Sequence, residues 1–311
     1  MTDIEKKMHK RWGKKFKDKR DWTEYNKQLV KRGEIFLDLD WVKNWNKELE
    51  AMNRNKVGGR FLFPDSLIQL QALWHAKTFT YRMIKGITRE LCRIAKLPAY
   101  NDFCTANRRI NQLGLKLDLP KGDNLTVFSD GSGFQAIDGG EYLREKHGKK
   151  NRRWVQIIIL GDPVTKEPVS FEVNIIPRSE ADSTKDQVKD LEGKGIKIAA
   201  VGGDGAMDEM GLWDLIQSKK LKPIIKPDKN ARDDTKNDLR NNVVKERNKK
   251  GYKKWAKKNK YGFRWPATEG IFSAIKRIFG EHLHAKTEIG LTQEATIKIW
   301  AYQKIKRHGT A

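Results

Sequence analysis

Hydrophobic residues in the first third of the chain recur every three or four positions, the spacing of amphipathic helices. Residues 64–66 (Pro-Asp-Ser) are a good helix start. Apolar residues then follow at helical spacing: Leu67, Leu70, Leu73 and Trp74. A second helix is predicted over residues 81–96, and Asn101 can cap a third that Gly114 ends.

Residues 21–52 also have helical character, with one aromatic side and a break at Gly33. Large aromatic residues at helical spacing are more often core residues than platforms for stacked bases. We therefore expect the tryptophans of this stretch to be buried: Trp22, Trp41 and Trp45.

Beyond about residue 120 the pattern changes to β-branched runs and apolar alternation, which predict strands. Residues 126–133 (Thr-Val-Phe-Ser-Asp-Gly-Ser-Gly) are predicted as a short strand that ends in an acid and a glycine turn. The remaining predictions are strands over 154–160, 168–176, 196–201 and 221–225, with helices over 182–192 and 207–220. The predicted fold class is α/β, a mixed sheet flanked by helices after an all-helical N-terminal domain. We place the domains at residues 1–118 and 119–311.

The stretch from Tyr261 to Arg277 is predicted as a helix entered from a turn, with two faces. Its apolar residues form a stripe to be buried: Ile271, Ile275, Ile278 and Phe279. Glu269, Ser273 and Lys276 share the opposite side, and Arg264 precedes them. This arrangement suits a charged partner, although a solvated charged face has the same pattern.

The net charge of the chain narrows the class of molecule that it is expected to bind. Lys and Arg number 64 against 40 Asp and Glu, which gives a formal charge of +24 and points to a polyanion. No apolar run approaches the ~18 residues of a spanning helix, and the start of the chain has no signal-peptide hydrophobic stretch. We therefore expect a cytoplasmic, nucleoid-associated protein that binds double-stranded DNA and no membrane.

Three basic segments are candidates for DNA contact. Residues 1–20 are either a solubilising tail or an arm on DNA phosphates. The third predicted helix carries Arg108 and Arg109, which fits a helix-turn-helix-like reader as well as an ordinary helical bundle. Residues 226–260 are densely basic and lead into the Arg264–Lys276 stretch, so we interpret them as a phosphate-tracking surface.

The candidate chemistry lies in three acids. Asp130 and Asp204 each follow a predicted strand with glycine beside them, and sites in open α/β sheets gather at the carboxyl ends of strands. Glu269 stands at the entrance of a helix. Three carboxylates can hold two divalent ions that clamp a phosphodiester, with Mg²⁺ favoured and Mn²⁺ as a substitute. Each aspartate alone could equally be a turn acid satisfied by backbone amides.

Three motifs carry a resemblance to a known family: Val-Phe-Ser-Asp130-Gly-Ser-Gly, Val-Gly-Gly-Asp204-Gly-Ala-Met-Asp, and Tyr261-x-x-Arg264 with Glu269-x6-Lys276. In this order they resemble the DDE transposases of prokaryotic insertion sequences, which have a ribonuclease H-like catalytic domain and a Tyr-Arg-Glu-Lys signature. The resemblance covers most of the chain and includes the Trp22-x-x-Tyr25-x3-Leu29-x2-Arg32-Gly33 stretch. One departure is visible, since four residues separate Arg264 from Glu269 where the commonest signature has three.

The resemblance implies roles for these residues. Asp130, Asp204 and Glu269 would be the catalytic, metal-binding triad. Arg264 and Lys276 would contact DNA phosphates near the cleavage point, with Tyr261 in the same signature.

The resemblance also implies an activity, in which the enzyme cleaves DNA at element ends with a two-metal mechanism and joins the freed 3′-hydroxyl to target DNA. A homo-oligomer on DNA is implied as well, and the sequence has no cofactor-binding motif. Two alternatives stay open: a ribonuclease H-like structure-specific nuclease, and a non-catalytic DNA-binding protein derived from a transposase.

Overall fold

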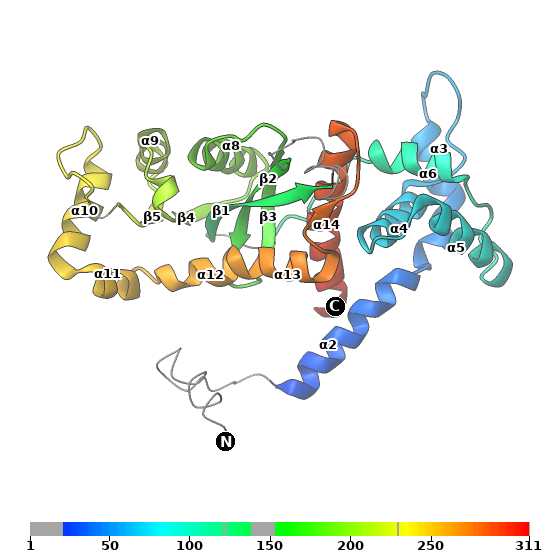
Figure 1. The fold of residues 1–311 in the computed structure, drawn as a ribbon, viewed down its shortest axis with the longest axis horizontal. Coiled ribbons are helices and arrows are strands. Elements are labelled where there is room, and N and C mark those ends of the chain that lie inside the picture. Colours follow the sequence, from blue (N-terminus) through cyan, green and yellow to red (C-terminus); the bar gives the residue numbers. More distant parts are fainter. Residues whose placement is uncertain (1–20, 121, 123, 138–152, 229, 311) are drawn as a thin grey trace, which may run out of the picture. The chain divides into compact units, whose positions relative to one another are not determined.

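The computed structural model describes residues 21–120, 122, 124–137, 153–228 and 230–310 (Figure 1). The predicted basic arm at residues 1–20 lies outside the described residues. The chain divides into two compact units, which we describe separately. The first holds α2 (Trp22–Glu34), η1 (Ile35–Leu37) and the last residues of α14 (Glu288–Thr310); the second is residues 39–304. The division at residue 118 stays a prediction.

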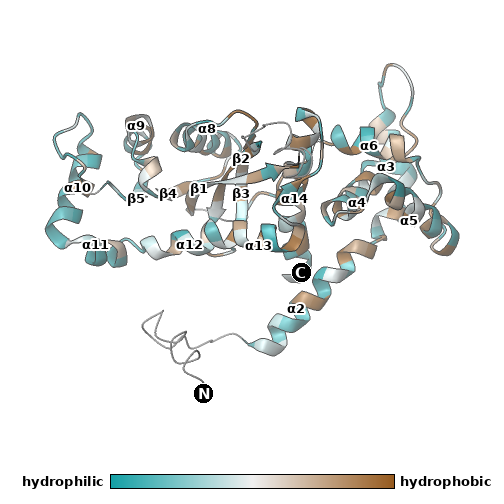
Figure 2. Cartoon of the chain, in the orientation of Figure 1, coloured by the Kyte–Doolittle hydropathy of each residue, from teal (hydrophilic) through white to brown (hydrophobic). Residues whose placement is uncertain are grey.

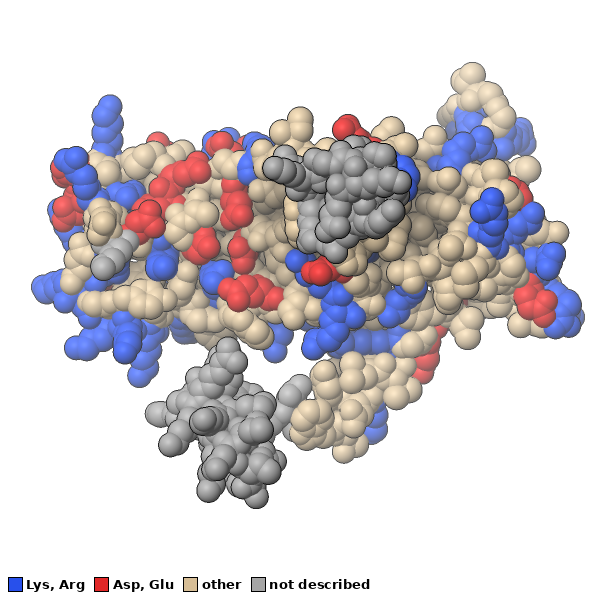
Figure 3. All heavy atoms as spheres, in the orientation of Figure 1, with Lys and Arg blue, Asp and Glu red and all other residues tan. Residues whose placement is uncertain are grey.

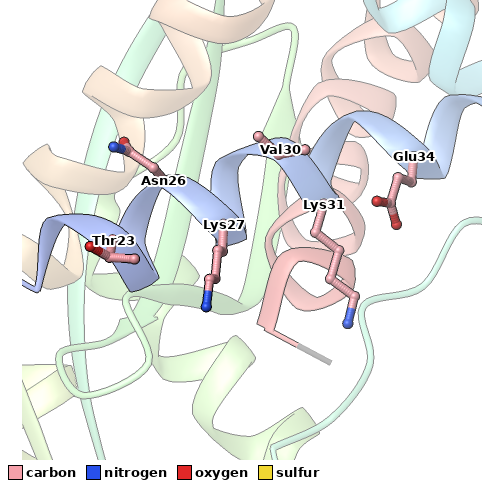
Figure 4. A pocket seen from close by; sticks show the side chains of 6 residues that line it. All are labelled: Thr23, Asn26, Lys27, Val30, Lys31 and Glu34. Carbon is pink, nitrogen blue, oxygen red and sulfur yellow. The ribbon is translucent and has the colours of Figure 1, made fainter.

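Helix α2 begins where the Asp21 carboxylate accepts hydrogen bonds from the backbone N–H groups of Thr23 and Glu24. None of its residues is buried, and Trp22 is 51% exposed. The expectation that Trp22 lies in the core is therefore wrong. A shallow hollow on α2 (Figure 4) is lined by Thr23, Asn26, Lys27, Val30, Lys31 and Glu34. All six come from one helix, so the hollow is an exposed helix face.

The second unit opens with an all-helical region. It contains η2 (Asp40–Asn44), α3 (Trp45–Asn53), α4 (Asp65–Ala76), α5 (Tyr81–Ile94) and α6 (Phe103–Asn111). Helices α4, α5 and α6 pack on one another around a buried core: Leu67, Ile68, Ile84, Leu91 and Ile110. The helices predicted from residues 64 and 81 are confirmed, and Trp45 is buried as expected.

Asn101 does not cap α6, contrary to the sequence prediction. The cap is Asp102, whose carboxylate accepts a hydrogen bond from the N–H of Cys104 at 3.0 Å. Asn101 is buried and exchanges two side-chain hydrogen bonds with Gln71 of α4, at 2.6 and 3.0 Å. A buried amide needs such partners, so Asn101 joins α4 to the start of α6.

The rest of the unit is built on a six-stranded mixed sheet, whose main path runs β3-β2-β1-β4-β5. The strands are β1 (Leu125–Ala136), β2 (Trp154–Asp162), β3 (Glu167–Asn174), β4 (Ile198–Gly203), β5 (Lys222–Ile225) and β6 (His282–Leu283). Strands β1, β2 and β3 are antiparallel neighbours, whereas β4, β5 and β6 join parallel pairs. The predicted order of strands and helices from β1 to β5 is confirmed. The fold class is also confirmed, as a mixed α/β sheet flanked by helices after a helical region.

Strand β1 is longer than predicted. The segment Gly131-Ser132-Gly133 does not form a turn but continues the strand, and it pairs with Ile158, Ile157 and Gln156 of β2. A Cβ on Gly133 would lie 2.9 Å from a ring carbon of Trp154. Glycine is therefore used here for close approach within the sheet, which the sequence pattern does not distinguish from a turn.

Helices cover both faces of the sheet (Figure 1). On one face α8 (Glu180–Gly193), η3 (Gly205–Met207) and α9 (Met210–Ser218) pack on a core that includes Val127, Leu160, Val201 and Trp213. The other face buries Phe128, Ala200 and Ile224 against α11 (Tyr252–Lys258), η4 (Tyr261–Phe263) and α12 (Arg264–Ala267). Side chains of a strand alternate between faces, so Asp130 shares the face of Phe128 and α12.

Gly161 of β2 sets how closely α12 approaches the sheet. A Cβ added there would lie 1.7 Å from the carbonyl oxygen of Ala267, well inside van der Waals contact. Helix α13 (Glu269–Phe279) starts two residues later, so this contact also places Glu269. Of its predicted buried stripe, Ile271, Ile275 and Phe279 are buried, while Ile278 is half-buried.

The elements after α13 were not predicted. Strand β6 pairs with β1, and α14 follows. Lys298 of α14 is buried and donates hydrogen bonds to the carbonyl oxygens of His282 at 2.5 Å and Gly280 at 3.3 Å. Helix α10 (Asp238–Lys250) completes the unit. Within the described part of the chain, no helix combines the length and the apolar character needed to cross a membrane.

Candidate active site

Asp130 and Asp204 lie at the same level on neighbouring parallel strands. Phe128 of β1 is aligned with Gly202 of β4, and each aspartate stands two residues further on. Their carboxylates each accept one backbone hydrogen bond, from Gly131 at 3.0 Å and from Ala206 at 2.9 Å. The turn-acid alternative therefore accounts for one oxygen of each carboxylate.

Arg264 connects the third acid to the first. Its Nη1 lies 3.2 Å from Oδ2 of Asp130, and its Nη2 lies 2.5 Å from Oε1 of Glu269. The Arg264 side chain is 20% exposed and that of Asp130 is 15% exposed. The structure thus brings Asp130 and Glu269, 139 residues apart in sequence (269 − 130 = 139), onto one guanidinium.

Burial and crowding perturb the acids. Burial raises the pKa of Asp130 above its ordinary value, and the Asp204 charge adds to the rise, although Arg264 opposes it. Asp204 is therefore close enough to Asp130 to interact electrostatically. Figure 3 shows acidic side chains gathered between α12 and the α8–α9 side of the sheet.

Sequence reasoning missed a fourth acid, Glu180. It is the first residue of α8, directly after the cap Ser179, and a Cβ on Gly131 would lie 2.1 Å from its Oε1. Burial first, then the charges of Asp130 and Asp204, raise the pKa of Glu180 to about 7. An acid in the first turn of a helix is ordinary, so the only signal in the sequence was the glycine next to Asp130.

The other signature residues have defined surroundings. Tyr261 is buried beside Trp255 and Tyr252, and burial raises its pKa to about 12. The Arg264 guanidinium lies 5.9 Å from the centre of the Tyr261 ring. Lys276 is half-buried, with its Nζ 5.4 Å from the centre of the Phe134 ring. The Tyr261 ring therefore lies beside the Arg264 guanidinium.

The two arginines of α6 differ in their burial. Arg108 is exposed. Arg109 is buried, with Nη2 2.7 Å from Asp65 and Nη1 donating to the carbonyl oxygen of Phe63 at 3.1 Å. Arg109 could reach DNA only by giving up these interactions, so the structure gives it a role in packing α6.

The candidate ligands for a divalent metal are the carboxylates of Asp130, Glu180, Asp204 and Glu269. Across the described residues, no group of three or more His, Cys, Asp or Glu side chains is arranged to hold a metal ion as it stands. The chemistry of the set nevertheless fits a hard cation, because its ligands are carboxylate oxygens and two of the carboxylates already lie against a positive group. That positive group is the Arg264 guanidinium, which would have to move for a metal to bind between Asp130 and Glu269.

Comparison with known proteins gives one decisive match. The model of the family described as "Transposase DDE domain" matches residues 122–303, which is more than half of the chain. All four acids of the site lie inside the matched range.

Two solved structures are similar at low levels. One is the Drosophila P element transposase strand transfer complex, with 15% identity, a TM-score of 0.31, and coverage of 65% of this chain and 48% of that one. The other is the piggyBac transposase synaptic complex with hairpin DNA, with 11% identity, a TM-score of 0.28, and coverage of 67% and 52%. This chain spans about half the length of each.

Proposed function

Because this chain belongs to the family of transposases with a DDE domain, we propose that it cleaves DNA at the ends of a mobile element and joins the freed 3′-hydroxyl to target DNA. The observation that carries the proposal is the meeting of Asp130 and Glu269 on Arg264, with Asp204 on the adjacent strand. Acids from three separate parts of the family-matched range would then form one site. The element would be a prokaryotic insertion sequence, on the strength of the sequence motifs.

Asp130, Asp204 and Glu269 would hold Mg²⁺, with Mn²⁺ as a substitute, and the charge of Glu180 would interact with those of Asp130 and Asp204. Bound divalent ions would supply Lewis-acid stabilisation of the phosphodiester and ready water or a 3′-hydroxyl as nucleophile. Burial first, and then the charges of neighbouring carboxylates, raise the pKa values of Asp130 and Glu180, as expected of acids that await cations.

Arg264 would act in two states. Without metal or DNA it neutralises Asp130 and Glu269. With both bound, its planar guanidinium would turn to a phosphate of the DNA backbone, a group that it can bind bidentately. The Tyr261 ring beneath it would limit where the side chain can go. Lys276 lies further along α13, on the side that Glu269 occupies, and would contact a neighbouring phosphate.

Helices α10 and α11 would track the DNA backbone. Most of their lysines are exposed: Lys245, Lys249, Lys250, Lys253, Lys254, Lys257 and Lys258. Glu246 is the acid among them and pairs with Lys250 and Lys258. Figure 2 shows α10 as predominantly hydrophilic, and Figure 3 shows Lys and Arg gathered at this end of the sheet. Trp255 is buried, so it is a core residue and not a stacking platform.

The experiment is a cleavage and joining assay on duplexes that carry the inverted repeats flanking the coding region. We expect Mg²⁺-dependent nicking by the wild type. Asp130→Asn, Asp204→Asn and Glu269→Gln should each lower cleavage by at least 10³-fold, on the order of a lost metal ligand or key charge, while binding of the duplex is kept. Asp190→Asn, an exposed acid on α8, is the matched control and should cleave like the wild type.

The assay also separates the alternatives. Cleaved ends that are never joined to target DNA, even when supplied pre-cleaved, would identify a nuclease. DNA binding without any Mg²⁺- or Mn²⁺-dependent cleavage would identify a non-catalytic protein. Sedimentation with and without paired element ends would test the homo-oligomer.

A further inference from the structure

The loop between α3 and α4 is closed at its base by one side chain. The amide of Asn53 donates to the carbonyl oxygen of Phe61 at 2.9 Å and accepts from the N–H of Phe61 at 2.7 Å. Inside the loop, Lys56 donates to the carbonyl oxygen of Gly59. Residues 54–60 therefore project as a pinned loop whose conformation is fixed from within.

The loop is basic and exposed. It carries Arg54, Lys56 and Arg60, and no acid occurs between Glu50 and Asp65. Arg54 and Arg60 are exposed, and Val57 at the tip is 96% exposed. Asp65, the acid that follows, is already paired with Arg109 at 2.7 Å. The positive charge of the loop is thus not balanced by the nearest acids in the sequence.

The loop and α6 together form a groove. Its volume is about 420 Å³, and its lining includes Arg60 and Phe61 from the loop side with Thr105, Arg108 and Gln112 from α6. The Phe61 ring is held between cations, with the Arg109 guanidinium 4.4 Å and the Lys56 Nζ 4.8 Å from its centre. In the space-filling view, Lys and Arg gather near the α3–α6 end of the helical region (Figure 3).

We propose that this loop groove binds the sugar-phosphate backbone of DNA, with Arg54, Arg60 and Arg108 as its phosphate contacts. The proposal rests on the proposed function, since it assumes that the protein binds DNA. Guanidinium groups suit phosphate because they donate paired hydrogen bonds and stay charged. The Asn53–Phe61 bonds fix the loop in advance, which lowers the entropic cost of ordering it on DNA. Contacts of this kind set the position of a reading helix rather than its sequence preference.

The test is a titration of an element-end duplex by fluorescence anisotropy over a range of salt concentrations. The loop variant is Arg54→Gln, Arg60→Gln, Arg108→Gln. The control is Lys189→Gln, Lys220→Gln, Lys222→Gln, which removes the same charge at exposed sites near α8 and β5. Loss of three phosphate contacts should make the slope of log K against log salt shallower by about 2–3, because each contributes about 0.9. The control should change the slope by less than about 1.

A third variant separates the effect of the fixed loop conformation from the effect of the loop's charge. Asn53→Ala keeps every cation but removes both bonds to Phe61, and it should weaken binding at least about threefold while circular dichroism shows a folded protein. Equal slope changes in the two triple variants, or wild-type affinity in a folded Asn53→Ala protein, would overturn the loop groove alone. Wild-type protein that binds no duplex at any salt concentration would overturn the proposed function together with it.

Discussion

The ion pairs of Arg264 lead to a prediction about metal binding that can be tested without measuring catalysis. Its guanidinium neutralises Asp130 and Glu269 in the metal-free protein. Replacing it by glutamine leaves two crowded carboxylates without their cation. We therefore expect Arg264→Gln to be less stable than the wild type without metal, and to bind Mg²⁺ more tightly.

The magnitude follows from exposure. Removing one partner of a buried ion pair costs about 3–5 kcal/mol, and an exposed pair contributes about 0–1 kcal/mol. Asp130 is 15% exposed and Glu269 is 45% exposed, so we expect a loss of about 2–3 kcal/mol in the free energy of unfolding. If the guanidinium contributes this only without metal, its removal should tighten Mg²⁺ binding by about 30–100-fold, since 1.4 kcal/mol is a factor of ten.

The assays are urea unfolding without metal and isothermal titration with Mg²⁺. The control is Arg232→Gln, whose side chain is 81% exposed and pairs with Asp234; it should change neither quantity measurably. An Arg264→Gln protein that binds Mg²⁺ no more tightly than the wild type would refute the reasoning, because the guanidinium would then not compete with the metal.

Three further predictions concern stability. Glu180 has a pKa of about 7 in the folded protein against an ordinary 4.5, so its contribution to the free energy of unfolding is fully present below about pH 4.5 and is lost as the pH rises through 7. After allowance for the partial exposure of Glu180, we expect this loss to be about 1–2 kcal/mol. Urea unfolding of Glu180→Gln should not show the loss. Asp208→Ala leaves the buried Arg240 without its carboxylate and should cost about 3–5 kcal/mol in urea unfolding. Gly161→Ala forces a methyl group against the carbonyl oxygen of Ala267 and should lower stability by about 1–3 kcal/mol, together with Mg²⁺-dependent cleavage, because Glu269 shifts with α12.

Each of these has its control. Metal-free wild type and Glu180→Gln that lose the same stability between pH 5 and pH 8 would contradict the first prediction. Asp234→Ala removes an exposed ion pair and should leave the free energy of unfolding close to that of the wild type; an equally small effect of Asp208→Ala would contradict the second. Gly33→Ala meets nothing within 4 Å in a helix and should be neutral or slightly stabilising. Gly161→Ala with wild-type stability would contradict the third.

Much of the fold follows from local patterns. Helices α4 and α5 are predicted from apolar residues at helical spacing, and β2 and β3 from β-branched and alternating runs, although β2 is buried on both of its faces. Strand β1 was cut short because Gly131 and Gly133 look like turn residues, whereas they admit the Glu180 carboxylate and the Trp154 ring. The pairing of β6 with β1 could not be predicted, because its two residues give no period and the contact is long-range.

The candidate site was predictable only in part. Asp130 and Asp204 were each predicted to follow the end of a strand, and their strands are parallel neighbours. Asp204 does follow β4, whereas Asp130 lies within β1, which continues beyond Gly133. Glu180 was missed because nothing distinguishes it locally from any acid in a first turn. The bridge from Arg264 to Asp130 depends on how closely α12 packs on Gly161, which only three-dimensional structure defines. Arg109 was predicted as a DNA contact from charge alone, but burial against Asp65 is invisible in sequence.

The central claim is that Asp130, Asp204 and Glu269 form one metal site. The most direct measurement is anomalous diffraction at the manganese edge from crystals grown with Mn²⁺ and an element-end duplex. We predict anomalous peaks in contact with the carboxylates of Asp130 and Asp204, and Arg264 turned away from Asp130. Manganese bound elsewhere, with Arg264 still joining Asp130 to Glu269, would contradict the account.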